Sequence, residues 1–207
     1  SMLSLEDNPL NHKKRSEIYT HFNFLSNPLP LPAKPLNKPK RIRIGYFSSD
    51  FKEHPVSYLL AGILENHDRN QFEIFGYSIK GNNEDDLRKR LIKSFDVFDD
   101  ISFLSDKDAA LLARQDKIDI AVDLNGYTLN ARSQIFAHRA APIQINYLGY
   151  NVTMGANFID YMFTDKNVIP LNCQHYCSEK LIYLPDTFMP TDNNRKFSEK
   201  LISRKEM

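Results

Sequence analysis

This sequence has no long apolar runs, almost no excess of positive over negative charge and few cysteines. Each of these shortages excludes a class of protein. No run approaches the roughly 18 apolar residues that a transmembrane helix needs, and no signal peptide is visible, so we expect no membrane span. The net charge is only +1, which gives no general attraction to nucleic acid or to an anionic membrane. Two cysteines, Cys173 and Cys177, make no disulfide framework, so we expect a reducing cytoplasm.

Glycine is also scarce, with 7 residues, which is few for a protein that wraps phosphates in a glycine-rich loop. The sequence contains no G-x-G-x-x-G, no P-loop and no G-x-S-x-G motif. The motifs on which dinucleotide-binding proteins, P-loop NTPases and α/β hydrolases depend are therefore missing. Cys173, His175 and Cys177 form C-x-H-x-C, but a zinc site needs four ligands and no second pair is evident, so we expect no metal.

The 207 residues suffice for one substantial α/β domain or two small ones, and 42% hydrophobic with 26% charged residues is typical of globular proteins. We divide the chain into three parts. Residues 1–40 hold a helical segment, with Ile18, Phe22 and Leu25 at helical spacing, and a linker at 27–40 that contains five prolines. Residues 41–190 form the main domain, and residues 191–207 form a polar tail.

Strand and helix patterns alternate through the main domain. Strands are predicted at 41–47, 71–79, 97–101, 118–124, 143–148, 159–163 and 180–184, and helices at 56–67, 84–94, 105–117 and 131–138. In the helix at 56–67 we expect Tyr58, Leu59, Ile63 and Leu64 to share the buried face. Ser105 is expected to cap the helix that follows it. This alternation predicts an α/β fold with a doubly wound, mainly parallel sheet.

The loop after the first strand places an acid and a histidine at the edge of the sheet where ligands collect in such folds. Pro55 suits the first helical turn, so His54 lies at the helix N-terminus, where the helix dipole disfavours the imidazolium ion. Asp50 lies four residues earlier and could orient the ring or act as a base itself. The alternative is structural: Asp50 caps the turn and His54 is a surface loop residue.

Two later loops are expected at the same edge. One of them, which follows the strand at 118–124, contains Asn125, Tyr127, Thr128 and Arg132. Tyr127 and Asn125 could bind a polar substrate, and Arg132 could meet a peptide carbonyl or a phosphate. In the loop after the strand at 143–148, Gly149 and Gly155 allow a close backbone approach beside Tyr150. The alternative for the Asn125 loop is an ordinary turn that leads into a helix.

Three stretches carry a family resemblance: RIGYFSSDFKEHPVSYLL at 43–60, IDIAVDLNGYTLNARSQIFAHRAAPIQINYLGYNVTMGANFIDYMFTD at 118–165, and SEKLIYLPDTF at 178–188. They resemble the catalytic region of glycosyltransferase family 41, which comprises O-GlcNAc transferases and SPINDLY-type protein O-fucosyltransferases. The resemblance implies a GT-B enzyme of two Rossmann-like lobes, of which this chain matches the N-terminal lobe. It further implies a C-terminal lobe that supplies most nucleotide contacts, and tetratricopeptide repeats upstream, with residues 3–25 as their last helix.

Carried over by position, the resemblance implies that His54 is the active-site histidine and that Asp50 is an aspartate considered as a base. It also implies a substrate-binding surface. This surface comprises Pro55, Tyr127, Thr128, Arg132, Gly149 and Tyr150.

The function implied is metal-independent, inverting transfer of N-acetylglucosamine from UDP-GlcNAc to Ser or Thr hydroxyls of proteins, with no cofactor beyond the nucleotide sugar. This chain would supply the acceptor and base half of the site and be inactive alone. Fucosyl transfer from GDP-fucose is an alternative, because Val56 stands where O-GlcNAc transferases often carry a hydroxyl residue. Tyr127 argues against it, because SPINDLY-type proteins carry Gly-His-Thr there. A non-catalytic binding or dimerisation module is a further alternative.

Overall fold

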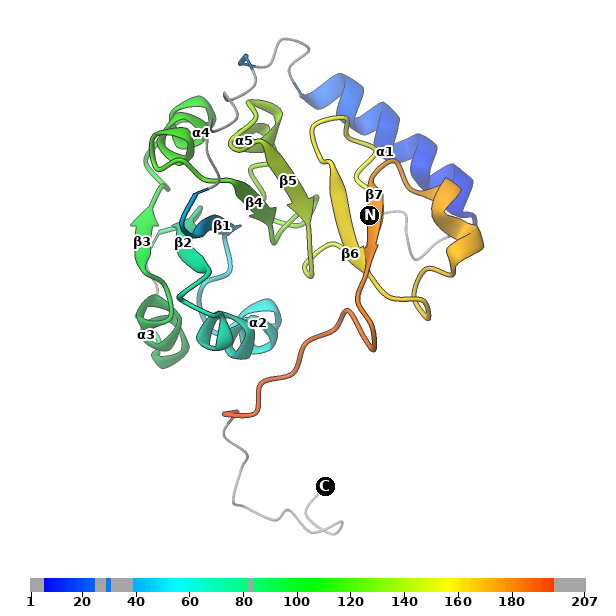
Figure 1. Ribbon diagram of the computed structural model, residues 1–207. Coiled ribbons are helices and arrows are strands. Elements are labelled where there is room, and N and C mark those ends of the chain that lie inside the picture. Colours follow the sequence, from blue (N-terminus) through cyan, green and yellow to red (C-terminus); the bar gives the residue numbers. More distant parts are fainter. Residues whose placement is uncertain (1–5, 25–28, 31–38, 82–83, 196–207) are drawn as a thin grey trace, which may run out of the picture.

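The computed structural model describes residues 6–24, 29–30, 39–81 and 84–195. The elements in chain order are α1 (Pro9–Asn23), β1 (Ile42–Ser48), α2 (Pro55–Asn66), β2 (Phe72–Ser78), α3 (Asp86–Lys93), β3 (Val97–Asp100), α4 (Asp106–Gln115), β4 (Ile120–Asp123), α5 (Gln134–Ala137), β5 (Ile143–Asn146), β6 (Tyr161–Thr164), the 3-10 helix η1 (Leu171–Tyr176) and β7 (Lys180–Tyr183) (Figure 1). No helix in these ranges is both long and apolar enough to span a membrane.

The sheet has seven strands in the order β3-β2-β1-β4-β5-β6-β7, and every pairing is parallel. Helices α4, α5 and α1 lie on one side of it and α2 and α3 on the other (Figure 1). Because parallel strands are connected by crossovers, both faces of the sheet are covered and the central strands are apolar on both sides. The predicted α/β class and doubly wound parallel sheet are confirmed.

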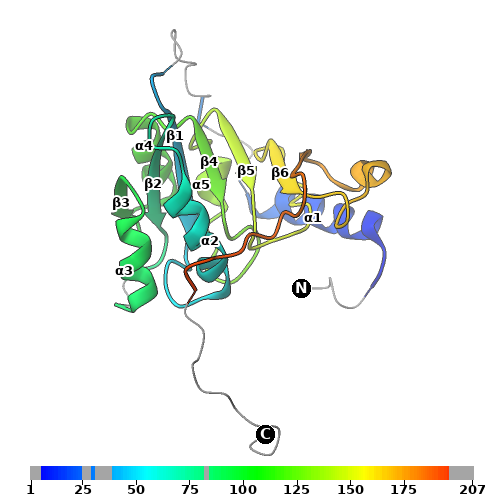
Figure 2. The same cartoon turned by 60° about the horizontal axis from the view of Figure 1, so that its bottom comes forward.

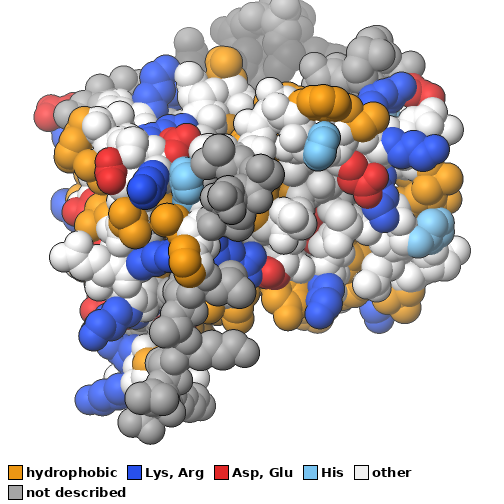
Figure 3. Space-filling model, turned by 90° about the horizontal axis from the view of Figure 1, so that it is seen from above, with side chains coloured by type: hydrophobic (Ala, Val, Ile, Leu, Met, Phe, Trp, Pro, Cys, Tyr) orange, Lys and Arg blue, Asp and Glu red, His pale blue; other side chains and the backbone are white. Residues whose placement is uncertain are grey.

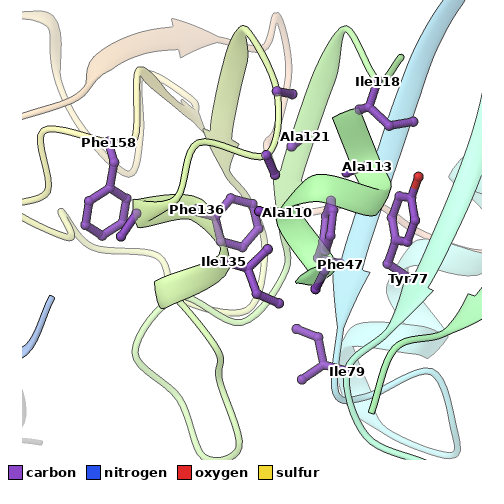
Figure 4. Packing of buried hydrophobic residues seen from close by; sticks show 14 of the residues in the cluster. Phe47, Tyr77, Ile79, Ala110, Ala113, Ile118, Ala121, Ile135, Phe136 and Phe158 are labelled. Carbon is purple, nitrogen blue, oxygen red and sulfur yellow. The ribbon is translucent and has the colours of Figure 1, made fainter. Parts of the chain in front are cut away.

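Two hydrophobic clusters hold the layers together. On the side of α4 and α5, Phe47 stacks on Tyr77 and meets the ring of Phe136 edge-on (Figure 4). On the side of α2 and α3, the second cluster includes the fully buried Leu60, Leu64 and Leu91. Each fully buried Leu or Phe side chain stabilises the fold by about 1.5–3 kcal/mol relative to an exposed one.

The buried face of helix α2 matches the predicted one at Leu64 but not at the other three positions. Val56, Leu60 and Leu64 point into the core, whereas Tyr58 is exposed and Leu59 and Ile63 are only partly buried. The helix is apolar on most of its circumference, so spacing alone does not select the face that meets the sheet. The Ser105 cap of α4 is confirmed, because its Oγ accepts a hydrogen bond from the N–H of Asp108 at 3.1 Å.

Helix α1 also turns its apolar stripe outward, since Ile18 is 58% and Phe22 79% exposed. It packs on the domain through small polar residues instead, with Ser16 buried and Thr20 donating to the carbonyl of Met154 at 3.0 Å. Most of the predicted linker, and residue Leu25, lie outside the described residues.

The segment after β7 runs back to α2 and α3 (Figure 2). There Arg90 forms an ion pair with Asp192 at 2.7 Å and a second with Glu65 at 2.7 Å. The start of the predicted tail is therefore tied to the helical layer, while residues 196–207 lie outside the described residues.

Candidate active site

The three loops singled out in the sequence follow β1, β4 and β5, which are neighbours in the sheet. Since all three strands are parallel, the loops lie side by side at one edge, the carboxyl edge, where open α/β sheets bind ligands. We call them the first loop (49–54), the second loop (124–133) and the third loop (147–155).

His54 is the N-cap of α2. A residue before proline avoids helical geometry, and His54 has φ −154° and ψ 147°, which lets its side chain turn back onto the helix end. Its Nδ1 accepts a hydrogen bond from the N–H of Val56 at 3.3 Å. In the neutral ring the proton is then on Nε2. The side chain remains 37% exposed, so a ligand can reach it.

Asp50 faces the same ring from a buried position. Its Oδ2 lies 3.9 Å from His54 Nδ1, which is too long for a hydrogen bond. The same oxygen accepts a hydrogen bond from Asn125 Nδ2 at 2.8 Å, and the Ser57 hydroxyl donates to the Asp50 carbonyl. Asp50 is thus fixed by the second loop and by α2, within reach of the imidazole.

Asn125 connects the first and second loops. Its Oδ1 accepts the N–H of Ser49 at 2.8 Å, and its Nδ2 donates to Asp50 and also to Ser49 Oγ at 3.0 Å. Thr128 in turn donates its hydroxyl proton to the Asn125 carbonyl at 2.9 Å. The buried Asn125 side chain is therefore used inside the protein, and it is a connector of loops rather than the substrate-binding group suggested by the sequence.

Two glycines interlock the second and third loops. Gly126 has φ +54°, and a Cβ there would collide with the side chain of Tyr150. A Cβ on Gly149 would collide with the carbonyl oxygen of Leu124, closer than real Cβ atoms approach anything. Close backbone approach, predicted for Gly149, is confirmed, and it serves loop-to-loop packing.

Tyr127 is held by α1. Its hydroxyl is 2.6 Å from Thr20 Oγ1, and since Thr20 donates to the Met154 carbonyl, Tyr127 is the donor between them. Phe24 stacks on the Tyr127 ring at 5.8 Å between centroids, and Tyr150 packs on it at 5.5 Å. Burial raises the pKa of Tyr127, so the phenol stays neutral.

Arg132 is already bound by neighbouring groups. Its Nε donates to Asp106 at 2.6 Å, and its two terminal nitrogens donate to the carbonyls of Ile101 and Leu104 at 2.9 and 2.6 Å. The guanidinium therefore anchors the loop before α4. It also lines a cavity of about 330 Å³ between α1 and the second loop, together with Phe24 and Thr128.

Asp123, at the end of β4, is a residue that sequence reasoning missed. It is fully buried, its Oδ1 accepts the N–H groups of Asn125 and Gly126 at 2.9 and 3.0 Å, and burial raises its pKa to about 6. The sequence did carry a signal for Asp123, because this acid stands in the otherwise largely apolar strand predicted at 118–124. Thr20 had no such signal, since it is 107 residues away from Tyr127 in the chain.

The C-x-H-x-C residues lie elsewhere, on η1 and its end, where Lys13 of α1 donates to the carbonyls of His175 and Cys177 at 3.0 and 3.2 Å. Among the described residues, no three His, Cys, Asp or Glu side chains gather as a metal site would require. On the face shown in Figure 3, basic, acidic and hydrophobic side chains are interspersed.

Comparison with known proteins gives concordant matches. The model of a family described as glycosyl transferase family 41 matches residues 9–206. The chain is 42% identical over 171 residues to the probable UDP-N-acetylglucosamine–peptide N-acetylglucosaminyltransferase SEC of Arabidopsis thaliana, covering 83% of this chain and 18% of that protein. It is 43% identical over 155 residues to the UDP-N-acetylglucosamine–peptide N-acetylglucosaminyltransferase of Caenorhabditis elegans, covering 74% of this chain and 14% of that protein.

A solved structure agrees in fold. A mutant of the Thermobaculum terrenum O-GlcNAc transferase superposes with a TM-score of 0.82 at 32% identity, over 88% of this chain and 35% of that chain. The predicted Rossmann-like lobe of a GT-B fold is thereby confirmed, and the chain spans less than a fifth of the two curated relatives' length. The family match runs through all three loops at the carboxyl edge, and it shows that this chain belongs to glycosyltransferase family 41.

Proposed function

We propose that the protein containing this chain transfers N-acetylglucosamine from UDP-GlcNAc to Ser or Thr hydroxyls of proteins with inversion, and that residues 41–190 supply the base and acceptor side. The observation that carries the proposal is the half-exposed imidazole of His54 at the carboxyl edge, with the Asp50 carboxylate 3.9 Å from it. Both relatives named above are peptide N-acetylglucosaminyltransferases by their names.

The geometry suggests how the acceptor proton is removed. For His54 to accept that proton on Nε2, its own proton must lie on Nδ1, which now accepts from Val56. A small rotation of the ring releases Val56 and points Nδ1–H at Asp50 Oδ2, 3.9 Å away in this structure. The carboxylate then stabilises the imidazolium that forms, so His54 is the proposed base and Asp50 its orienting partner.

The acceptor wall is proposed to consist of Pro55, Tyr127, Thr128, Gly149 and Tyr150. The aromatic rings give it a rigid, largely apolar surface with the polar Thr128 at its margin. Arg132 contributes indirectly in this proposal, because its hydrogen bonds hold the loop before α4 rather than facing a ligand.

The leaving diphosphate needs cations and dipoles, which we assign to a C-terminal lobe outside this chain. Upstream tetratricopeptide repeats are the other proposed partner, along with the nucleotide sugar and the acceptor protein. No metal or organic cofactor enters the proposal. We propose the cytoplasm as the compartment, because Cys173 and Cys177 are both free thiols.

Fucosyl transfer from GDP-fucose is the second candidate, and it rests on Val56, which stands where O-GlcNAc transferases often carry a hydroxyl residue. The test compares the complete protein and the isolated 207-residue chain with UDP-GlcNAc and with GDP-fucose. We expect turnover of UDP-GlcNAc by the complete protein and none by the isolated chain. Turnover of GDP-fucose but not of UDP-GlcNAc would show that the donor is GDP-fucose. Turnover by the isolated chain would refute the assignment of half the site to this chain. Peptide binding without any turnover would indicate a non-catalytic binding module.

A further inference from the structure

Two buried polar atoms at the carboxyl edge have no hydrogen-bond partner among the described residues, Asp123 Oδ2 and Asn146 Oδ1. Asp123 is 1% exposed and Asn146 is 0% exposed. Leaving a buried acceptor unsatisfied is unfavourable, and few native polar groups are left in that state. Two such atoms on neighbouring strands indicate a proton or a bridging molecule between them.

The strand register places these two residues side by side. Asp123 of β4 pairs with Asn146 of β5 in a parallel ladder, so their side chains leave the sheet on the same face. This is the face of Ala121, two residues before Asp123, and of Phe47, which pairs with Asp123 from β1 (Figure 4). Neighbouring strands lie about 4.8 Å apart, which brings two short side chains within hydrogen-bond reach.

The other atoms of the pair are already assigned. Oδ1 of Asp123 accepts two backbone N–H groups of the second loop. Nδ2 of Asn146 donates to the carbonyls of Tyr150 and Val152 in the third loop, at 2.9 and 3.3 Å. Flipping the Asn146 amide would point Oδ1 at two carbonyl oxygens, so the orientation is fixed. Both remaining atoms are acceptors unless one of them carries a proton.

We propose that Asp123 binds a proton in the folded chain more readily than an ordinary aspartate does, and that the resulting Oδ2–H donates to Asn146 Oδ1. This one proton satisfies both atoms and links the second loop to the third. Asp123 and Asn146 then hold the second and third loops in their relative positions, and this assignment does not depend on the proposed function.

The surroundings favour the protonated form. Burial raises the pKa of Asp123 to about 6, opposed only in part by its two backbone N–H bonds. The charge of Asp123 reaches the Tyr127 phenol of the second loop, and Tyr150 packs on the Tyr127 ring. Burial raises the pKa of both phenols. Among the described residues, no cationic side chain counters the effect of burial on the Asp123 pKa.

The first test is carbon-13 NMR titration of the aspartate carboxyl groups in the 207-residue chain, with Asp123→Asn identifying the signal by its disappearance. We expect that signal to titrate at least one pH unit above the ordinary aspartate value of about 3.9. Titration at or below the ordinary value would overturn the proposal, and it would mean an ionised Asp123 with a water or cation beside Asn146.

The second test compares variants by thermal melts from pH 5 to pH 8. The amide of Asp123→Asn reproduces the neutral acid, with Oδ1 accepting from the second loop and Nδ2 donating to Asn146, so we expect a melting temperature equal to or above the wild type at pH 8. Asp123→Leu can neither accept hydrogen bonds from the second loop nor donate one to Asn146, so it should have a lower melting temperature than the wild type at every pH. Asp119→Asn, at the opposite end of β4, is the control that should keep the wild-type pH dependence. A lower melting temperature for Asp123→Asn than for the wild type throughout the range would contradict the proposal.

Discussion

The first loop and the two loops beside it are built in opposite ways. In the first loop, the proposed base His54 is half-exposed and is held by one long hydrogen bond. The second and third loops are interlocked at Gly126 and Gly149 and pinned by α1 through Tyr127. A group that must take up and release a proton needs freedom to rotate, whereas a surface that positions a substrate needs to be rigid. We therefore expect substitutions in the interlocked loops to have large effects on stability and substitutions at His54 to have small ones.

The largest effect on stability is expected for Gly149→Ala. The added Cβ would overlap the carbonyl oxygen of Leu124, which is backbone and has no room to move, so we expect a loss of about 3 kcal/mol or more in the free energy of unfolding. Chemical denaturation measures it. Gly81→Ala is the matched control, because its Cβ would meet the Ser102 hydroxyl at 3.3 Å and the Asp100 carboxylate at 3.7 Å, which are side-chain atoms and not backbone. It should change stability by less than about 0.5 kcal/mol. Equal losses of stability for the two substitutions would show that the close packing at Gly149 is not what holds the second and third loops rigid.

The next effect concerns pH and the Asp123 carboxyl. Its pKa is raised to about 6 in the folded chain, so its contribution to stability is complete below about pH 4 and is lost as the pH rises through 6. The shift of about 2 pKa units corresponds to at most about 3 kcal/mol. The difference in free energy of unfolding, Asp123→Asn minus wild type, should increase by up to this amount between pH 4 and pH 7. A flat difference across that range would show that Asp123 ionises normally.

A smaller effect is expected where α1 meets the second loop. Tyr127→Phe removes the hydroxyl that donates to Thr20, and Thr20→Val removes both of that residue's hydrogen bonds. We expect each to lower stability by about 1 kcal/mol, with a double variant that loses less than the sum, because the two share one bond. Tyr58→Phe, on the exposed side of α2, should have no effect. Strict additivity would mean that α1 and the second loop are not coupled through this pair.

The smallest structural effect is expected at His54. Asparagine is a good N-cap, so His54→Asn should keep the bond to Val56 and change the free energy of unfolding by less than about 0.5 kcal/mol. His54→Ala loses the cap and should cost about 1 kcal/mol. Urea denaturation of both variants measures these changes in the free energy of unfolding. A large loss for His54→Asn would show that the imidazole has a structural role beyond capping.

The sequence was sufficient for the sheet, because strand runs such as 118–124 and the cap at Ser105 depend on local pattern. It was also sufficient to place His54, because Pro55 dictates the helix start. It could not select the buried face of α2, where nearly every position is apolar, nor the inward face of α1, which packs through Ser16 and Thr20.

The contacts between loops were beyond sequence reasoning for a related reason. Asn125, Asp123 and Arg132 are polar residues in loops and at a strand end, which is also how substrate-binding residues look in a sequence. Only their partners show that these residues connect parts of the protein. Asn125 binds Asp50, 75 residues away in the chain, and Arg132 binds Asp106, 26 residues away. Those partners are set by the order of the strands, not by local pattern.

The most direct test of the central proposal is the turnover of the complete protein carrying His54→Asn, with UDP-GlcNAc and an acceptor peptide. The cap is preserved, so peptide affinity and stability should stay near wild type while turnover falls by at least about 100-fold, as expected for loss of a general base. His175→Ala, which removes an exposed histidine on η1, should retain full turnover. Wild-type turnover in His54→Asn would contradict the assignment of His54 as the base.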